Sequence, residues 1–184
     1  MKKNRFKYNV AISGSSELKV CNEETKKKAF VLGKELAYNK CVVISGATRG
    51  IPHIVCCGNS QAKGLNIGFS PAQTKAAHIK SYKLPCDPYD VIIYTGADYT
   101  GRNLIMTKSA EAMIIVSGRA GTMHEFLTAF ETGKIIGVLE GTGGVADQIK
   151  GFLKGVNKRA KAPVIYHADP KELVKLVILE LEKL

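Results

Sequence analysis

The sequence contains no tryptophan, and only 7% of its residues are aromatic. Proteins that bind single-stranded nucleic acid without sequence preference need aromatic side chains on which the bases stack, so this composition argues against a nucleic-acid partner. No apolar segment approaches the length that spans a bilayer, and we expect no membrane partner. The basic start, Met1-Lys2-Lys3-Asn4-Arg5, leads into strand-like sequence without a separate apolar segment. We therefore expect no secretory signal and a cytoplasmic location.

Cysteine and histidine lack the spacing of metal ligands. The five cysteines are an odd number without a Cys-x-x-Cys pair, and the four histidines are scattered. This pattern predicts reduced thiols, no metal site and no redox cofactor. Cys56 and Cys57 fall in what the pattern predicts to be a buried helix face, whereas a reactive thiol needs an electropositive, partly exposed setting.

Acidic residues are few beside the basic ones, 16 against 27, and the formal net charge is +11. This excess predicts attraction to anions, but the lysines are spread along the chain, so nucleotides, polynucleotides and acidic proteins all remain open. The 184 residues include 45% apolar residues and no low-complexity linker. They predict one globular domain over residues 1–184.

Short apolar strands alternate with helical patterns along the chain. This alternation predicts a three-layer, doubly wound, Rossmann-like α/β fold with a mainly parallel sheet in the order 3-2-1-4-5-6. In such a sheet, ligands bind beyond the carboxyl ends of the strands. We expect a short extended segment facing the site at residues 91–95. The six expected strands are 8–13, 41–45, 65–70, 111–117, 134–139 and 162–166, and the main expected helices are 22–39, 51–63, 102–110, 121–133, 144–154 and 170–184.

The stretch around residues 114–125 carries the strongest functional signal. Its apolar strand stops at Gly118 and Gly121, and a helical pattern starts at once behind them. Such a turn lets backbone amides approach an anion, and the helix dipole adds partial positive charge there. We interpret residues 118–122 as a phosphate cradle in which Thr122 contributes its amide and hydroxyl, with Glu125 one turn further along. The alternative for Glu125 is a capping box, because Thr-x-x-Glu is also the pattern of a helix cap.

Further glycine turns follow the first two expected strands, at Gly14-Ser15 and at Gly46-Ala47-Thr48. They suit close approach to a ligand, although any doubly wound sheet needs glycine where helices begin close to strands. Arg102-Asn103 is expected to open the helix before the cradle, on the ligand edge, where an arginine can grip a phosphate with two hydrogen bonds.

These residues resemble a known family: the Rossmann-fold nucleotide-binding proteins long misnamed lysine decarboxylases, which include the cytokinin-activating LONELY GUY phosphoribohydrolases. The resemblance runs from Val10 to about Gly144. The family's Pro-Gly-Gly-x-Gly-Thr-x-x-Glu element resembles residues 117–125, its upstream arginine resembles Arg102, and its second-strand glycine turn resembles residues 45–50.

The sequence departs from the family pattern at three positions. Ser117 replaces the proline, and Arg119 replaces the second glycine, which crowds the cradle unless the arginine turns outward or itself binds phosphate. Arg102-Asn103 stands where the plant-like enzymes have Arg-Lys, and in this it resembles a neighbouring subgroup that includes molybdenum-cofactor carrier proteins.

The resemblance implies two functions. One is hydrolysis of the N-glycosidic bond of a nucleoside 5′-monophosphate, in which the carboxylate of Glu125 stabilises the developing oxocarbenium ion and Arg102 holds the phosphate or sugar. The other is a carrier or sensor for a nucleotide or molybdopterin-type ligand, without turnover. Both need no cofactor. The expected binding residues are Gly14, Ser15, Gly46, Ala47, Thr48, Asn103, Gly118, Arg119, Ala120, Gly121 and Thr122.

The expected helix at residues 51–63 is apolar almost all round, and such a helix needs packing partners on more than one face. Single-domain relatives assemble through helices that flank the site. We therefore expect a homodimer or a larger homo-oligomer.

Overall fold

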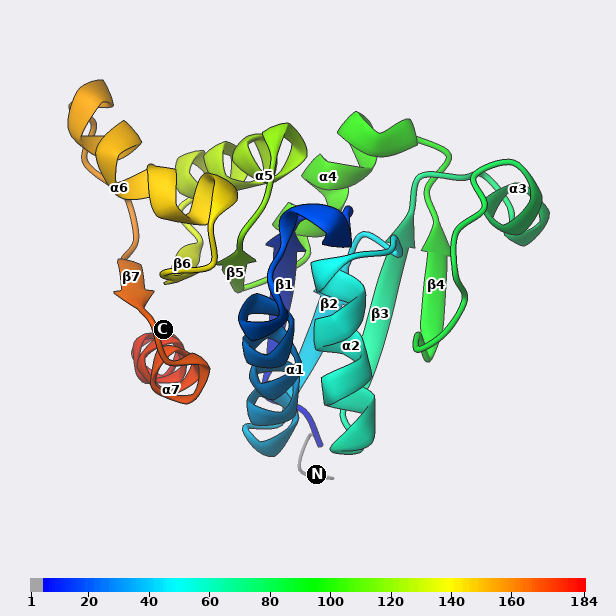
Figure 1. The fold of residues 1–184 in the computed structure, drawn as a ribbon, viewed down its shortest axis with the longest axis horizontal. Coiled ribbons are helices and arrows are strands. Elements are labelled where there is room, and N and C mark those ends of the chain that lie inside the picture. The colour runs from blue at the N-terminus through cyan, green and yellow to red at the C-terminus, as the bar shows by residue number, and fades with distance from the viewer. Residues whose placement is uncertain (1–4) are drawn as a thin grey trace.

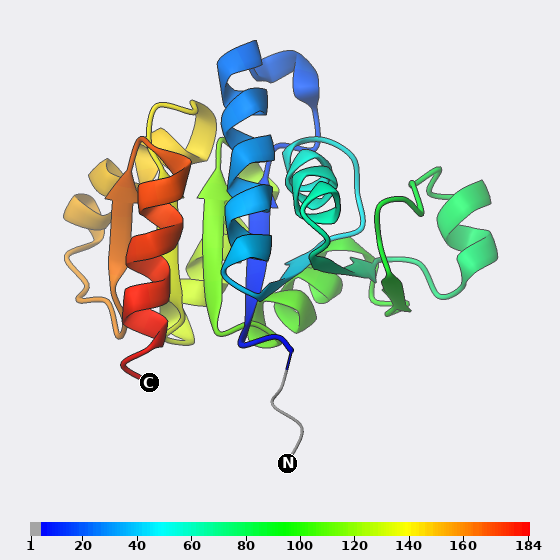
Figure 2. The same ribbon diagram turned by 90° about the horizontal axis from the view of Figure 1, so that it is seen from below.

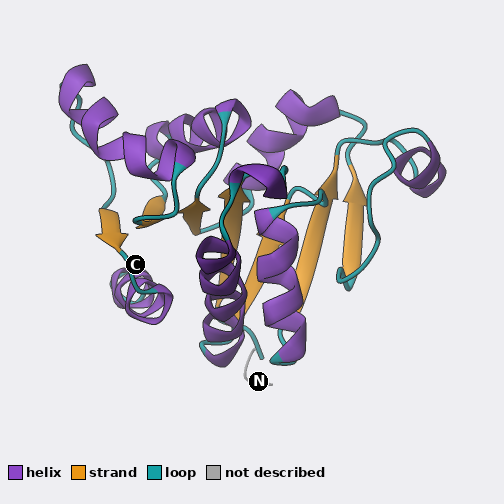
Figure 3. Cartoon of the chain, in the orientation of Figure 1, coloured by secondary structure: helices purple, strands orange, loops and turns teal. Residues whose placement is uncertain are grey.

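The computed structural model describes residues 5–184; the segment Met1–Asn4, on which the expectation about a secretory signal rests, lies outside them. Strands and helices alternate along the chain (Figures 1 and 3). The strands are β1 (Tyr8–Gly14), β2 (Cys41–Ser45), β3 (Leu65–Ser70), β4 (Val91–Tyr94), β5 (Ala112–Val116), β6 (Ile135–Leu139) and β7 (Val164–His167). The helices are α1 (Glu23–Tyr38), α2 (Ile51–Gln61), α3 (Lys75–Lys80), α4 (Asp98–Lys108), α5 (Ala120–Glu131), α6 (Gly144–Val156) and α7 (Pro170–Leu181), with a 3-10 turn at Leu18–Val20.

All seven strands form one parallel sheet in the order β4-β3-β2-β1-β5-β6-β7. The six expected strands lie in the expected order, so the doubly wound fold is confirmed. The order reverses between β1 and β5, where Ile12 pairs with Ile114. Residues 91–94 are extended, as expected, but they form the edge strand β4, which pairs with β3 through Ile67 and Val91 and does not line the site.

Helices cover both faces of the sheet. On one face, α1 packs between α2 and α7, and Figure 2 shows α1 and α7 side by side across the sheet. On the other face lie α4, α5 and α6 (Figure 1). Alternate residues of each central strand enter the two cores, as with Ile114 and Ile115 of β5. Because both faces are covered, the central strands are buried throughout and their sequences are continuously apolar.

The apolar surface of α2 is covered within the chain. The sheet covers one side, and α1 covers another at very close range. A Cβ added at Gly33 of α1 would lie 2.0 Å from the carbonyl oxygen of Val55, so only glycine allows this approach. Cys56 is fully buried, as expected, whereas Cys57 is partly exposed. The packing of α2 thus gives no separate argument for a second subunit.

Most helix ends follow their sequence signals, with one difference near the site. Asn22 caps α1 by accepting a hydrogen bond from the amide of Thr25 at 2.8 Å, and Asp169 caps α7. Helix α4 begins at Asp98, four residues earlier than expected. Arg102 and Asn103 therefore lie in its second turn instead of opening the helix.

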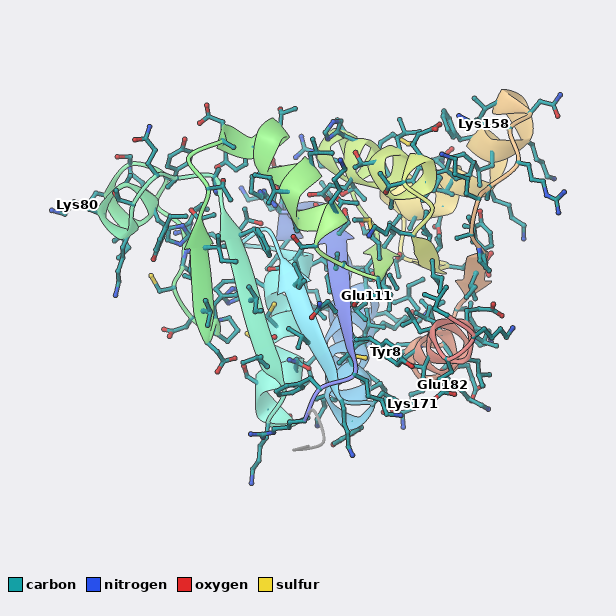
Figure 4. All side chains as sticks on the ribbon, turned by 180° about the vertical axis from the view of Figure 1, so that it is seen from behind. Tyr8, Lys80, Glu111, Lys158, Lys171 and Glu182 are labelled. Carbon is teal, nitrogen blue, oxygen red and sulfur yellow. The ribbon has the colours of Figure 1, made fainter. Side chains whose placement is uncertain are left out.

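Positive charge is distributed over the surface. Lys80 on α3 and Lys158 after α6 lie at opposite ends of the molecule (Figure 4). Lys158 is paired with Glu131 at 2.6 Å. Within residues 5–184, no helix is long and apolar enough to cross a membrane.

Candidate functional site

Four turns that follow β1, β2, β5 and β6 meet at the carboxyl edge of the sheet. A cavity of about 240 Å³ lies there, at the reversal of strand order between β1 and β5. The turns after β1 and β2, the first two turns of α4 and the beginning of α5 supply its walls. This is the position at which open parallel sheets bind their ligands.

The N-terminus of α5 faces the cavity. Its N-cap is Arg119, whose carbonyl accepts from the amide of Met123 at 3.0 Å. The amides of residues 120–122 come before this first bond and have no acceptor within the helix. Gly121 and Thr122 line the cavity. The first turn contains no acidic side chain, so the helix end offers an anion both free donors and an uncompensated dipole.

The backbone turn before α5 is held by the beginning of α6. Ser117 and Gly118 both have positive φ, 57° and 109°. The amides of Val145 and Ala146 donate to the carbonyls of Gly118 and Ser117, each at 3.0 Å. Proline cannot adopt the φ of Ser117, so this turn differs from one that begins with the family's proline. The N-terminus of α6 thus binds the protein's own backbone, and that of α5 remains open.

Glu125 lies in the wall of the cavity and is 8% exposed. Its Oε2 accepts from the hydroxyl of Ser13 at the end of β1. Its Oε1 lies 3.7 Å from Nη1 of Arg102. The side-chain amide of Asn103 is oriented with its nitrogen toward Glu125. In this orientation the nitrogen donates to Glu125 Oε1 and to the carbonyl oxygen of Tyr99, both at 2.9 Å. The carboxylate therefore joins β1, α4 and α5 at one point.

This arrangement excludes the capping-box interpretation of Glu125. In a capping box Thr122 would be the N-cap residue, but the N-cap is Arg119 and Thr122 already lies within the helix. Glu125 lies in the second turn, and its carboxylate contacts side chains of other elements. Its role concerns the cavity and the packing of three elements.

Burial shifts the ionisation of this cluster. It raises the pKa of Glu125 above the usual value of a glutamic acid, although the charge of Arg102 and the hydrogen bond from Ser13 oppose the shift. Burial likewise lowers the pKa of Arg102, and Glu125 opposes it. An arginine keeps its proton at neutral pH even so. The wall of the cavity therefore carries a buried cation beside a carboxyl group that is held less acidic than usual.

Arg102 is 5% exposed, and its guanidinium is only partly bonded. Nη1 contacts the sulfur of Met106 at 3.6 Å, and Nε is buried without a hydrogen-bond partner in the described part of the chain. The group lies against Gly46, where an added Cβ would come 1.7 Å from Nη1. Buried donors without partners are uncommon, and Arg102 also lines the cavity, so its incompletely bonded guanidinium belongs to the candidate site.

Arg119 stands at the mouth of the cavity. Its guanidinium pairs with Glu17, from the connection between β1 and α1. Both side chains are more than half exposed, so the pair itself contributes little stability. Arg119 therefore turns outward from the cradle and still lines the cavity, within reach of an anion that displaces Glu17.

The structure brings most of the expected site residues to the cavity. Three do not line it: Ala47 and Gly118 are buried, and Ala120 is exposed at the start of α5 outside the lining. The hydroxyl of Ser15 is occupied by the backbone of Glu17. The expected residues that do line the cavity are Gly14, Ser15, Gly46, Thr48, Arg102, Asn103, Arg119, Gly121, Thr122 and Glu125.

Sequence reasoning missed Ile12, Ser16, Pro52 and Tyr99 in the lining, and Ser13 behind it. Tyr99 had a usable signal, because it precedes Arg102 by three residues and such residues share a helix face. It was missed because α4 was expected to begin too late. Within residues 5–184, no group of three or more histidine, cysteine, aspartate and glutamate side chains is placed to hold a metal ion.

The chain is similar to several known proteins over most of its length. An uncharacterised protein from Archaeoglobus fulgidus is 28% identical over 131 residues, which are 71% of this chain and 79% of that protein. The crystal structure of the structural-genomics target TM1055 superposes with a TM-score of 0.80 at 24% identity, covering 94% of this chain and 99% of the other. The molybdenum cofactor carrier protein of Chlamydomonas reinhardtii superposes with a TM-score of 0.74 at 22% identity, covering 96% and 99%.

At these identities the two superpositions establish the shared fold. The family is established by a separate match, in which the model of the SLOG cluster4 family covers residues 7–174. This match confirms the relationship to the lysine-decarboxylase-like proteins that the motifs indicated. The chain therefore belongs to the SLOG cluster4 family.

Proposed function

We propose that this protein binds a nucleotide or a molybdopterin-type ligand through its phosphate group and carries or senses it. The observation that carries the proposal is the presence of two incompletely bonded donor sets at one cavity. One set is the free amides at the start of α5, and the other is the buried guanidinium of Arg102, whose Nε has no partner in the described residues. Together they suit an anion with several acceptor oxygens.

The state of Glu125 favours binding over turnover. Its carboxylate is engaged by Ser13, Arg102 and Asn103, so it has little freedom to attack or deprotonate a ligand. The similarity to a molybdenum cofactor carrier supports the same proposal at the level of the fold.

The proposal is tested by thermal unfolding with AMP and GMP and with the matching nucleosides. A ligand that binds only the native state raises the melting temperature by mass action. The nucleotides should raise it and the nucleosides should raise it far less, since the phosphate is the group bound. Equal shifts from AMP and adenosine, and from GMP and guanosine, would show that the cradle does not bind phosphate.

A matched pair of variants locates the effect. Arg119→Gln should reduce the shift that AMP and GMP produce, because Arg119 lines the mouth of the cavity. Arg159→Gln removes one charge from an exposed arginine outside the lining and should leave the shift unchanged. Equal losses in the two variants would mean that only the net charge of the protein matters.

A second candidate function is hydrolysis of the N-glycosidic bond of a nucleoside monophosphate. It is favoured by one observation, the location of the Glu125 carboxyl group in the same cavity as Arg102. In this reaction the bond between the ribose and the base breaks, a water oxygen joins the anomeric carbon and the base leaves with a proton. Glu125→Gln should then lower the rate of base release about a hundredfold or more. If the wild type releases no base from any common nucleoside monophosphate, hydrolysis is ruled out.

A further inference from the structure

A second cavity, of about 280 Å³, adjoins the phosphate site. Ser16, Thr48 and Tyr99 line both cavities, so the two lie side by side. Each is smaller than the roughly 300–1,000 Å³ of most small-molecule sites, whereas the two together fall within that range. A ligand held by its phosphate at α5 therefore has room to extend past Tyr99 into the second cavity.

The far wall of the second cavity comes from the loop between α3 and β4. Arg49, from the turn before α2, donates from Nη2 to the carbonyl of Lys83 at 2.9 Å and thereby holds this loop against the turn. Tyr82 lies edge-on to Tyr99, with ring centroids 5.8 Å apart, and its hydroxyl donates to Asp98 at 2.5 Å. These bonds fix an aromatic corner that presents ring surface to the cavity.

The chemistry of this corner suits a flat, electron-rich ring. Tyr99 is 48% exposed, although a large aromatic side chain gains free energy when its faces are covered. Arg49 and Lys83 add positive charge to the lining, and among the described residues the lining contains no carboxylate. Such donors prefer a ring edge rich in acceptors, as in the pairing of arginine or lysine with the O6 and N7 atoms of guanine, whereas adenine presents an amino donor there.

We propose that the second cavity holds the planar heteroaromatic end of the ligand, stacked on the Tyr82–Tyr99 corner with an oxo-bearing edge toward Arg49 and Lys83. The ligand class is thus a phosphate ester of an oxo-substituted nitrogen heterocycle, of the 6-oxopurine or pterin type. The proposal rests on the phosphate site described above and adds the identity of the other end of the ligand.

The test is isothermal titration calorimetry of the intact protein with inorganic phosphate, ribose 5-phosphate, AMP and GMP. Ribose 5-phosphate should bind more weakly than AMP, and GMP should bind at least about fivefold more tightly than AMP. GMP binding no tighter than ribose 5-phosphate, or AMP binding tighter than GMP, would overturn the proposal while leaving the phosphate site intact. If none of the phosphate compounds binds, the proposed function itself is wrong, and this proposal with it.

Variants of Tyr82 distinguish a role in stacking on the ligand from a role in supporting the fold. Tyr82→Leu should weaken the binding of GMP by about fivefold or more, since stacking of one base on an aromatic side chain contributes at least that much to affinity. The same variant should leave the affinity for ribose 5-phosphate unchanged. Tyr82→Phe keeps the ring, loses only the bond to Asp98 and should bind GMP nearly as the wild type does. Equal weakening of GMP and ribose 5-phosphate by Tyr82→Leu would mean that the tyrosine only supports the fold, and would overturn the proposal.

The contribution of Lys83 to recognition of the ring is tested against a matched control. Lys83 and Lys63 are both exposed and both have left-handed backbones, with φ of 53° and 61°. Lys83→Gln should reduce the preference for GMP over AMP. Lys63→Gln should not, because Lys63 lies just before β3, at the amino ends of the strands and outside both cavities. A preference that survives Lys83→Gln in full would contradict the assignment of the ring edge.

Discussion

Gly46→Ala is expected to displace the guanidinium of Arg102 from the wall of the cavity. The new Cβ would lie 1.7 Å from Nη1, 2.5 Å from Cζ and 2.8 Å from Nη2 of Arg102. Gly46 does not have a left-handed backbone, and the three atoms nearest to the added Cβ all belong to Arg102. The substitution thus tests one contact without adding backbone strain.

The expected loss in the free energy of unfolding follows from the packing around Gly46. Overfilling a well-packed core by one methyl group costs about 1–3 kcal/mol, and moving the arginine also weakens its pairing with the buried Glu125. A loss of about 3 kcal/mol in the free energy of unfolding lowers the melting temperature of a chain of this size by roughly 6–12 °C. The stabilisation by AMP or GMP should be lost as well, because Arg102 no longer faces the ligand.

Gly121→Ala is the matched control, since an added Cβ there has no neighbour within 4 Å and the residue also lines the cavity. It should leave the free energy of unfolding unchanged or raise it by up to about 1 kcal/mol, as alanine favours a helix more than glycine does. Both variants are measured by urea unfolding, followed by circular dichroism.

A double-mutant cycle tests the cause. In an Arg102→Met background the guanidinium is absent, so Gly46→Ala should cost less than about 1 kcal/mol there, which gives a coupling on the order of 2 kcal/mol. If Gly46→Ala costs the same in both backgrounds, the clash with Arg102 is not the cause of the lost stability, and the guanidinium does not lie against Gly46.

Three further predictions concern ionisation, capping and assembly. Because burial raises the pKa of Glu125 above 4.5, the native state binds this proton more tightly than the unfolded state does, and the free energy of unfolding should fall as the pH rises from about 4.5 through the raised pKa. Glu125→Gln should remove that slope, which urea titrations at several pH values will measure. Asp169→Ala should cost about 1 kcal/mol of stability and Asp169→Asn much less, since Asp169 caps α7 by accepting from two amides; equal costs would contradict the capping role. Light scattering at micromolar concentration should show a dimer or larger assembly, with the partly exposed Leu104, Ile105 and Leu127 of α4 and α5 as candidate contacts; a species of 19.9 kDa would refute assembly.

The central sheet was predictable because its strands are covered on both faces. Continuous apolar runs such as Ile114-Ile115-Val116 are what a buried parallel strand requires, and the glycine turns behind them marked the carboxyl edge. The edge strand β4 was not recognised because Val91 and Ile93 are half exposed and a loop with two prolines precedes them. A strand that is buried on both faces leaves a clear apolar pattern in the sequence, whereas an edge strand leaves a weak one.

The candidate site was only partly predictable, because its key contacts join distant parts of the chain. Ser13 and Glu125 are 112 residues apart, and no local pattern reveals that they meet. The Thr-x-x-Glu spacing also left a local cap open as an alternative, whereas the carboxylate of Glu125 contacts side chains of other elements. The beginning of α4 was misplaced because its first turn contains Asp98 and Gly101, both weak helix formers.

The bonds from Val145 and Ala146 to the turn at residues 117–118 have a consequence for dynamics. The C=O and N–H groups of a trans peptide point in opposite directions, so a turn whose oxygens are held by α6 has its amides oriented before a ligand arrives. Ligand binding should then order this turn very little, and little conformational entropy is lost there. Hydrogen exchange at Val145 and Ala146 should already be slow in the ligand-free protein. Substitutions at the start of α6 would alter ligand affinity from a distance, by loosening the turn that leads into α5.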